Sequence, residues 1–264
     1  MKAFNFIILI FIFLFLSACS TAPTNSQANK TAKPAISLKT QTPEQLIGQA
    51  QSNTSPTTKA SLYLLAAQQY YQNNLIAQCN ATLSSIIPSD LPTHELQHYL
   101  TLELTISVQS QDLRRIEKAL PLISAQALQQ TEIHKQIELL LLITEANKIA
   151  GRTIQAALTL IENSGLFDEQ QYSAIHEEIW HLLRATNAAN LSKFQYNGNN
   201  IDAIAWLDLA RLIQQNQINL EAQYLALQQW KNIWPNHPAT ITPPYELDIL
   251  EQLPNTRPTS ITLA

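Results

Sequence analysis

Apolar residues recur along most of the chain with the spacing of an amphipathic helix. In the sharpest stretch, positions i, i+3, i+4 and i+7 are occupied by Trp206, Leu209, Ala210 and Ile213. Side chains at this spacing share one face of a helix. After two helices that begin near residues 43 and 56, similar patterns predict helices at 75–86, 92–109, 112–121, 126–149, 153–163, 169–186, 201–214 and 218–233.

Signals for helix starts agree with this pattern. Thr42 precedes Pro43 at the first helical position, and Gln45 stands three residues after Thr42, which makes a capping box. Ser55 and Pro56 open the next helix in a similar way. Because the connections are short, neighbouring helices are expected to lie antiparallel. The predicted fold class is all-α.

The predicted helices pair into units that resemble tetratricopeptide repeats. The first unit contains Tyr63, Ala66, Ala67 and Tyr70, then Asn74 at the turn, then Cys79 and Leu83. The second contains Leu140, Ile143 and Thr144, then Gly151 at the turn, then Ala156 and Leu160. Both units have a small residue where two helices would cross closely. We therefore expect a tetratricopeptide-like helical-hairpin solenoid at 43–239, with Cys79 as a small buried residue.

The first residues have the layout of a bacterial lipoprotein signal. Lys2 precedes an apolar run from Phe6 to Leu16, which is shorter than the roughly 20 residues of a membrane-spanning helix. The run ends in Leu-Ser-Ala-Cys, which resembles a lipobox, so Cys19 is expected to be acylated after removal of residues 1–18. The alternative is an ordinary cleaved signal in which Cys19 stands by chance.

Residues 19–42 are polar, small and interrupted by proline, which favours a flexible tether. Ser20 follows Cys19, and in the enterobacterial sorting pattern this residue indicates the outer membrane. Several acyl chains would make the attachment effectively permanent, because each buried methylene contributes about 0.8 kcal/mol. The predicted location is the periplasmic face of the outer membrane. Residues 240–264 are expected to form an irregular segment.

Composition excludes several classes of function. The chain has four glycines and lacks a glycine-rich phosphate loop and a G-x-S-x-G nucleophile motif. Removing Lys2 from the 16 basic residues leaves 15 against 20 acidic ones, so nothing favours nucleic acid. Of the two cysteines, acylation would use Cys19, which leaves Cys79 without a disulfide partner. No cofactor is expected.

Residues 94–98 read HELQH, the H-E-x-x-H pattern of zinc peptidases. His94 and His98 would share a helix face and could bind Zn²⁺, with Glu95 as general base. On a helical wheel, however, the apolar residues that follow lie opposite the two histidines. The metzincin continuation is absent, and the context of Glu117 is unlike a third-ligand helix. We therefore expect a solvated helix face, with neither a catalytic residue nor a metal site.

The remaining candidate residues also favour structural roles. The other histidines, His134, His176, His181 and His237, are scattered without metal-binding spacing. Arg114 and Arg115 are expected to be an exposed helix start. We expect Trp206, Trp230 and Trp234 to be core residues, and His237 to be a hinge or cap of the solenoid.

The block at residues 205–239 carries a more specific resemblance. Its features are Trp206-Leu207-x-Leu209-Ala210, then Trp230, then Trp234-Pro235-x-His237-Pro238-Ala239. These features resemble the end of the N-terminal domain in the LpoA family, the outer-membrane lipoprotein activators of a bifunctional penicillin-binding protein. The lipobox, tether and helical body agree with that family. Its members continue into a second α/β domain that makes the main contact with the synthase, and we expect this chain to lack it.

The resemblance implies a non-catalytic scaffold that regulates peptidoglycan synthesis by binding and activating a bifunctional penicillin-binding protein. Two alternatives remain. A zinc metallopeptidase built on HELQH 94–98 would contain stoichiometric Zn²⁺ and lose activity on Glu95→Gln. A generic scaffold for envelope assembly in the periplasm would bind other envelope proteins.

Overall fold

The computed structural model describes residues 41–123 and 132–256, and this part contains helices and no strand. The α-helices are α2 (Pro43–Ser52), α3 (Pro56–Gln72), α4 (Ile76–Leu83), α5 (Thr93–Gln109), α6 (Leu113–Ala119), α8 (Ile133–Ile149), α9 (Thr153–Glu162), α10 (Glu169–Ala185), α11 (Ala188–Lys193), α12 (Ile201–Gln215), α13 (Leu220–Ile233), α14 (Pro238–Ile241) and α15 (Tyr245–Thr256). Short 3₁₀ helices are η1 (Pro88–Asp90), η2 (Leu120–Leu122) and η3 (Ser164–Leu166). None of the described helices has the length and apolarity to cross a membrane.

The predicted start of the first helix has the expected capping box. The backbone N–H of Gln45 donates to Thr42 Oγ1 at 3.4 Å, and the backbone N–H of Thr42 donates to Gln45 Oε1 at 3.1 Å. Ser55 accepts a hydrogen bond from the backbone N–H of Thr58 and so caps α3. These side chains satisfy backbone donors that a helix start would otherwise leave without partners.

Three helical hairpins turn in the same way. Asn74, Gln111 and Gly151 have positive φ angles of 58°, 53° and 69°, between α3 and α4, α5 and α6, and α8 and α9. At each turn the next N–H donates at 2.8 Å to a carbonyl five residues back, as in Leu75 N to Tyr70 O. This left-handed helix ending is favoured by Gly and Asn. Asn74 and Gly151 were predicted turn residues, whereas Gln111 was not.

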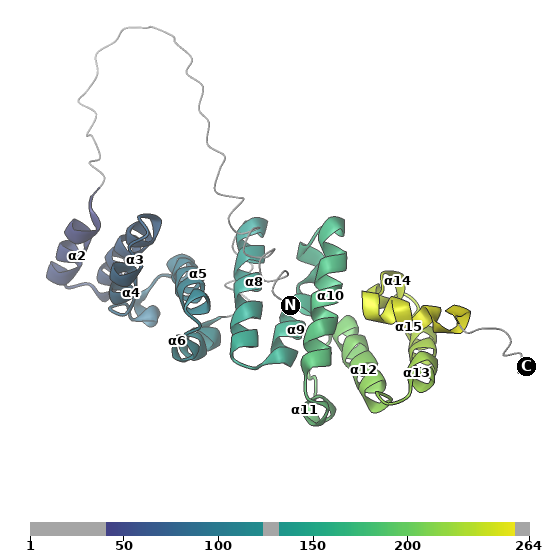
Figure 1. Cartoon of the computed structure of the whole chain (residues 1–264). Coiled ribbons are helices and arrows are strands. Elements are labelled where there is room, and N and C mark those ends of the chain that lie inside the picture. Colours follow the sequence, from purple (N-terminus) through teal and green to yellow (C-terminus); the bar gives the residue numbers. More distant parts are fainter. Residues whose placement is uncertain (1–40, 124–131, 257–264) are drawn as a thin grey trace, which may run out of the picture.

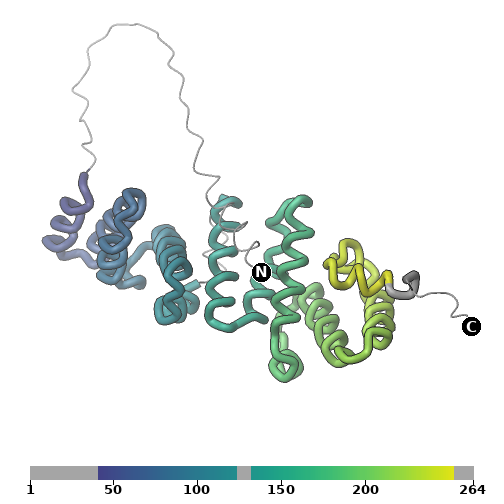
Figure 2. Tube along the Cα trace, in the orientation of Figure 1, coloured from purple at the N-terminus to yellow at the C-terminus, as the bar shows by residue number. Residues whose placement is uncertain are grey.

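The helices lie side by side in a row, so that α2 and α15 stand at opposite ends of the described body (Figure 1). The tube view shows the same arrangement, with each hairpin stacked on its neighbour (Figure 2). Buried side chains form one core cluster from α2 to α8 and a second from α9 to α15. The helix α8 joins them, because Leu139 belongs to the first cluster while Leu141 packs against the second.

The expected close helix crossings contain small residues. Cys79 on α4 and Ala156 on α9 are both fully buried, with an exposed fraction of 0%. Each stands on the second helix of its hairpin, as in tetratricopeptide-like units. The predictions of an all-α solenoid and of a buried Cys79 are confirmed.

Several predicted boundaries differ from the structure. The segment 240–264, expected to be irregular, contains the end of α14 and the helix α15, whose Leu247 and Leu250 are buried in the second core cluster. Burial of these two residues explains why α15 forms. The short helix α11 was not predicted. The helix predicted at 126–149 begins at Ile133 in the described part, and residues 126–131 lie outside that part.

Candidate functional site

The HELQH residues lie in the first two turns of α5. His94 and His98 are exposed, whereas Tyr99 and Leu100, toward the other side of the helix, are buried. The predicted orientation of the two histidines is therefore found in the structure. Within residues 41–123 and 132–256, no group of three or more His, Cys, Asp or Glu side chains is arranged to hold a metal ion. A peptidase centre needs a third protein ligand and a cleft.

Arg115 differs from its prediction as part of an exposed helix start. Its Nε and Nη2 donate to the two carboxylate oxygens of Glu103 at 2.7 and 2.5 Å, and its Nη1 donates to Asn80 Oδ1 at 2.5 Å. The hydrogen bonds to Glu103 raise the pKa of the Arg115 guanidinium. Only Arg114 is exposed as expected. Arg115 links α4, α5 and α6 through contacts that are distant in sequence.

Cys79 is not placed to act as a reactive thiol. Its side chain is fully buried, and desolvation raises the pKa of the thiol to about 11. At neutral pH the thiolate, which is the nucleophilic form, is therefore scarce. Cys19, the predicted lipid-attachment residue, lies outside the described residues.

His237 stands at the centre of an aromatic cluster near the C-terminal end of the solenoid. Its ring meets Trp206 and Trp230 edge-on, with centroid distances of 5.2 and 5.0 Å. Its Nδ1 accepts the backbone N–H of Ala239 at 3.1 Å and thereby caps α14, and its Nε2 lies 3.3 Å from Asp202 O. Burial lowers the pKa of His237 to about 4. His237 is thus the N-cap of α14, and its role as a hinge or cap of the whole solenoid stays a prediction.

The other aromatic and histidine residues divide between core and surface. Trp206 and Trp230 are each 1% exposed, so both are core residues as predicted, whereas Trp234 is only partly buried. His176 is also buried, and desolvation lowers its pKa. His134 and His181 are exposed on α8 and α10.

The last helix is held to the body by polar contacts that sequence reasoning missed. Trp180 Nε1 donates to Glu246 Oε2 at 2.9 Å, and Arg184 Nη2 lies 3.1 Å from Glu246 Oε1. The guanidinium of Arg184 also lies over the ring of Trp180, 5.8 Å from its centroid. A second ion pair joins Lys231 on α13 to Glu251 on α15. These contacts, together with buried Leu247 and Leu250, fix α15 across α10 and α13.

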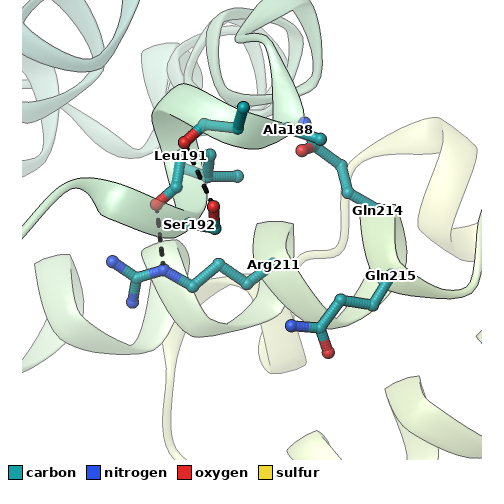
Figure 3. A pocket seen from close by; sticks show the side chains of 7 residues that line it. Ala188, Leu191, Ser192, Arg211, Gln214 and Gln215 are labelled. Carbon is teal, nitrogen blue, oxygen red and sulfur yellow. Dashed lines mark hydrogen bonds between the residues drawn. The ribbon is translucent and has the colours of Figure 1, made fainter.

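A cleft of about 290 Å³ lies between α11 and the end of α12 (Figure 3). Its polar side chains hold the neighbouring helix ends. Gln214 Nε2 donates to Leu183 O and Thr186 O at 3.2 and 3.0 Å, and Arg211 donates to Leu191 O and Phe194 O at 3.2 and 2.7 Å. These bonds satisfy carbonyls at the ends of α10 and α11. The polar residues of this cleft therefore position α11 against the ends of α10 and α12.

Comparison with known proteins places this helical body in a family. The protein-family model described as "LppC putative lipoprotein" matches residues 38–264 of this chain. The chain belongs to the LppC family. The resemblance to the LpoA family is confirmed, because the related curated proteins carry that name.

Two relatives of this LppC-family chain are named penicillin-binding protein activator LpoA. The protein of Glaesserella parasuis is 25% identical over 89% of this chain and 39% of its own length. The protein of Histophilus somni strain 2336 is 30% identical over 76% of this chain and 33% of its own length. The chain therefore spans between a third and two fifths of the length of these relatives.

Solved structures show the same fold. The LpoA N-terminal domain of Haemophilus influenzae has a TM-score of 0.51 at 22% identity, covering 80% of this chain and 93% of that domain. Full-length LpoA of the same organism has a TM-score of 0.52 at 21% identity, covering 84% of this chain and 40% of the other. The LppC-family chain thus corresponds to the N-terminal helical domain of these proteins.

Proposed function

We propose that this protein is a non-catalytic lipoprotein that binds and activates a bifunctional penicillin-binding protein, and so regulates peptidoglycan synthesis. The observation that carries the proposal is membership of the LppC family together with the fold of the LpoA N-terminal domain. Relatives over most of the chain are named as activators of penicillin-binding proteins. Stacked helical hairpins provide the extended surfaces that such scaffolds use to bind proteins.

The second part of the proposal is the location. The lipobox ending at Cys19 and the match to a lipoprotein family support acylation of Cys19 and anchoring to the periplasmic face of the outer membrane. The polar segment 19–42 would separate the anchor from the helical body. A Cys19→Ser variant is expected to lose palmitate labelling and to leave the outer-membrane fraction. Labelled Cys19→Ser protein in that fraction would contradict the proposed anchor.

Activation is tested with the purified chain and the bifunctional penicillin-binding protein of the same organism. Glycan polymerisation and peptide crosslinking are measured with and without the chain, and a full-length LpoA relative with its own synthase serves as the positive control. We expect binding and a faster synthase reaction. Because the chain spans only part of its relatives, binding and stimulation are scored separately. Absence of both would overturn the proposal.

The two alternatives predict other results. A scaffold for general envelope assembly would crosslink in cells to envelope proteins without recovering the synthase. A zinc peptidase would need a third ligand, and the described residues offer no such group near HELQH. The family match and the shared fold support the activator proposal, whereas the peptidase alternative rests on the HELQH pattern alone.

A further inference from the structure

His94 and His98 are one helical turn apart on the outer face of α5. The side chain of His94 is 77% exposed, and His98 is also exposed. Residues at i and i+4 have Cβ atoms roughly 5–6 Å apart on the helix surface. Both imidazoles can therefore turn toward one point in solvent without moving any core residue.

We propose that His94 and His98 form a two-ligand surface site for exchangeable divalent transition-metal ions of the Cu²⁺, Ni²⁺ and Zn²⁺ group. Imidazole nitrogen suits these ions, and two histidines at this helical spacing can bind one ion together. Water fills the remaining coordination positions. This proposal revises the expectation that HELQH holds no metal, but only for a two-ligand surface site. Such a site has no third protein ligand and no enclosing cleft, so it is not the catalytic centre of a peptidase.

Three effects act on an ion at this position. His94 is the second residue of α5, and the positive end of the helix dipole weakens cation binding by a few-fold. Glu95 Oε1 lies 3.8 Å from His94 Nε2, and its negative charge offsets part of that loss. Chelation is the largest effect, since a second ligand held nearby strengthens binding by about 10²–10⁴-fold. The balance favours binding.

The role of Glu95 separates this proposal from the peptidase alternative. In a peptidase Glu95 would be the general base, and Glu95→Gln would abolish activity. In the two-histidine site Glu95 supplies only a nearby charge. Its removal should therefore weaken binding by no more than a few-fold.

The test is calorimetric titration of the purified, tag-free chain with Cu²⁺ and then Ni²⁺. The wild-type chain is compared with His94→Ala, His98→Ala, the double variant and Glu95→Gln. His181→Ala is the matched control, because His181 is exposed on α10 and has no histidine four residues away. Circular dichroism establishes that each variant keeps its helix content.

We expect one Cu²⁺ to bind the wild-type chain more tightly than Ni²⁺ does, following the usual order for these ions. Either single substitution should weaken Cu²⁺ binding by about 100-fold, and the double variant, which keeps neither imidazole, should bind more weakly than either single variant. His181→Ala and Glu95→Gln should bind within a few-fold of wild type. The proposal is wrong if His98→Ala binds like wild type, or if His181→Ala loses as much affinity as His98→Ala.

Discussion

Glu103 and Arg115 form a two-point ion pair, with Arg115 Nε 2.7 Å from Glu103 Oε1 and Nη2 2.5 Å from Oε2. The pair joins α5 to α6, and Asn80 extends it to α4. Glu103 is only 7% exposed. Removing the guanidinium therefore leaves a buried carboxylate without its ionic partner.

We expect Arg115→Met to lower the free energy of unfolding by about 3 kcal/mol, because breaking a buried pair on one side strands the other charge. Urea denaturation at pH 7 measures the change. The adjacent Arg114→Met is the control and should stay within about 0.5 kcal/mol, since Arg114 is exposed. The double variant Glu103→Met with Arg115→Met should recover much of the loss. Equal losses for Arg114→Met and Arg115→Met would mean that the pair does not stabilise the fold.

His237 makes stability depend on pH. Its folded pKa of about 4 lies below the ordinary value of 6.5, so the unfolded chain binds a proton more readily. The part of the folding stability that depends on neutral His237 is fully present above pH 6.5, and it is lost as the pH falls toward 4. The shift corresponds to about 3 kcal/mol. Buried His176, whose pKa is also lowered, acts in the same direction, while Asp202 opposes both shifts and Glu177 opposes that of His176.

The comparison uses His237→Asn, because Asn can still cap α14 but does not titrate in this range. Urea denaturation of both proteins is measured at pH 7 and at pH 4.5. Wild type should lose about 2 kcal/mol more than the variant over this interval. Identical losses would show that His237 does not cause the acid sensitivity. Carboxylates that titrate in this range affect both proteins alike and cancel in the comparison.

Local signals made most of the helices predictable from sequence. Thr42, Ser55, Asn74 and Gly151 act on neighbouring backbone, so their roles could be read from a few residues. The role of Arg115 could not, because its partners stand 12 and 35 residues away. The helix α15 was not predicted, because Pro243 and Pro244 directly precede it and indicate irregular structure. The spacing of Leu247 and Leu250 was a weak signal for this helix. Its contact with Trp180 could not be predicted, because Trp180 and Glu246 stand 66 residues apart in the sequence.

Cys79 should be inert in the folded protein. The thiol is fully buried and its pKa is raised to about 11, so few thiolates are present or accessible at pH 8. In a Cys19→Ser background, a thiol reagent should label Cys79 only after denaturant unfolds the chain. The tight crossing also predicts that Cys79→Leu destabilises by about 1–3 kcal/mol, whereas Cys79→Ala costs less. Fast labelling without denaturant would contradict this burial.

The contact between Trp180 and Glu246 should control how firmly α15 is attached. Glu246→Ala removes the acceptor of the Trp180 N–H and the partner of Arg184, and an unpartnered buried donor costs about 1–3 kcal/mol. Since Glu246 is about half exposed, we expect the lower end of that range. The loss should appear as faster amide hydrogen exchange at Leu247 and Leu250, with little change at Ala210 in α12.

Two variants separate the contact from a general effect of charge on α15. Glu246→Gln keeps an oxygen that accepts from Trp180, so protection at Leu247 should fall less than in Glu246→Ala. Asp248→Ala removes a neighbouring acidic residue of the same first turn, whose carboxylate bonds only Gln252 among the hydrogen bonds found for the described residues. It therefore reports the helix-dipole contribution together with an exposed bond inside α15, without touching the contact to Trp180. If Asp248→Ala speeds exchange as much as Glu246→Ala, the first-turn charge rather than the bond to Trp180 holds α15.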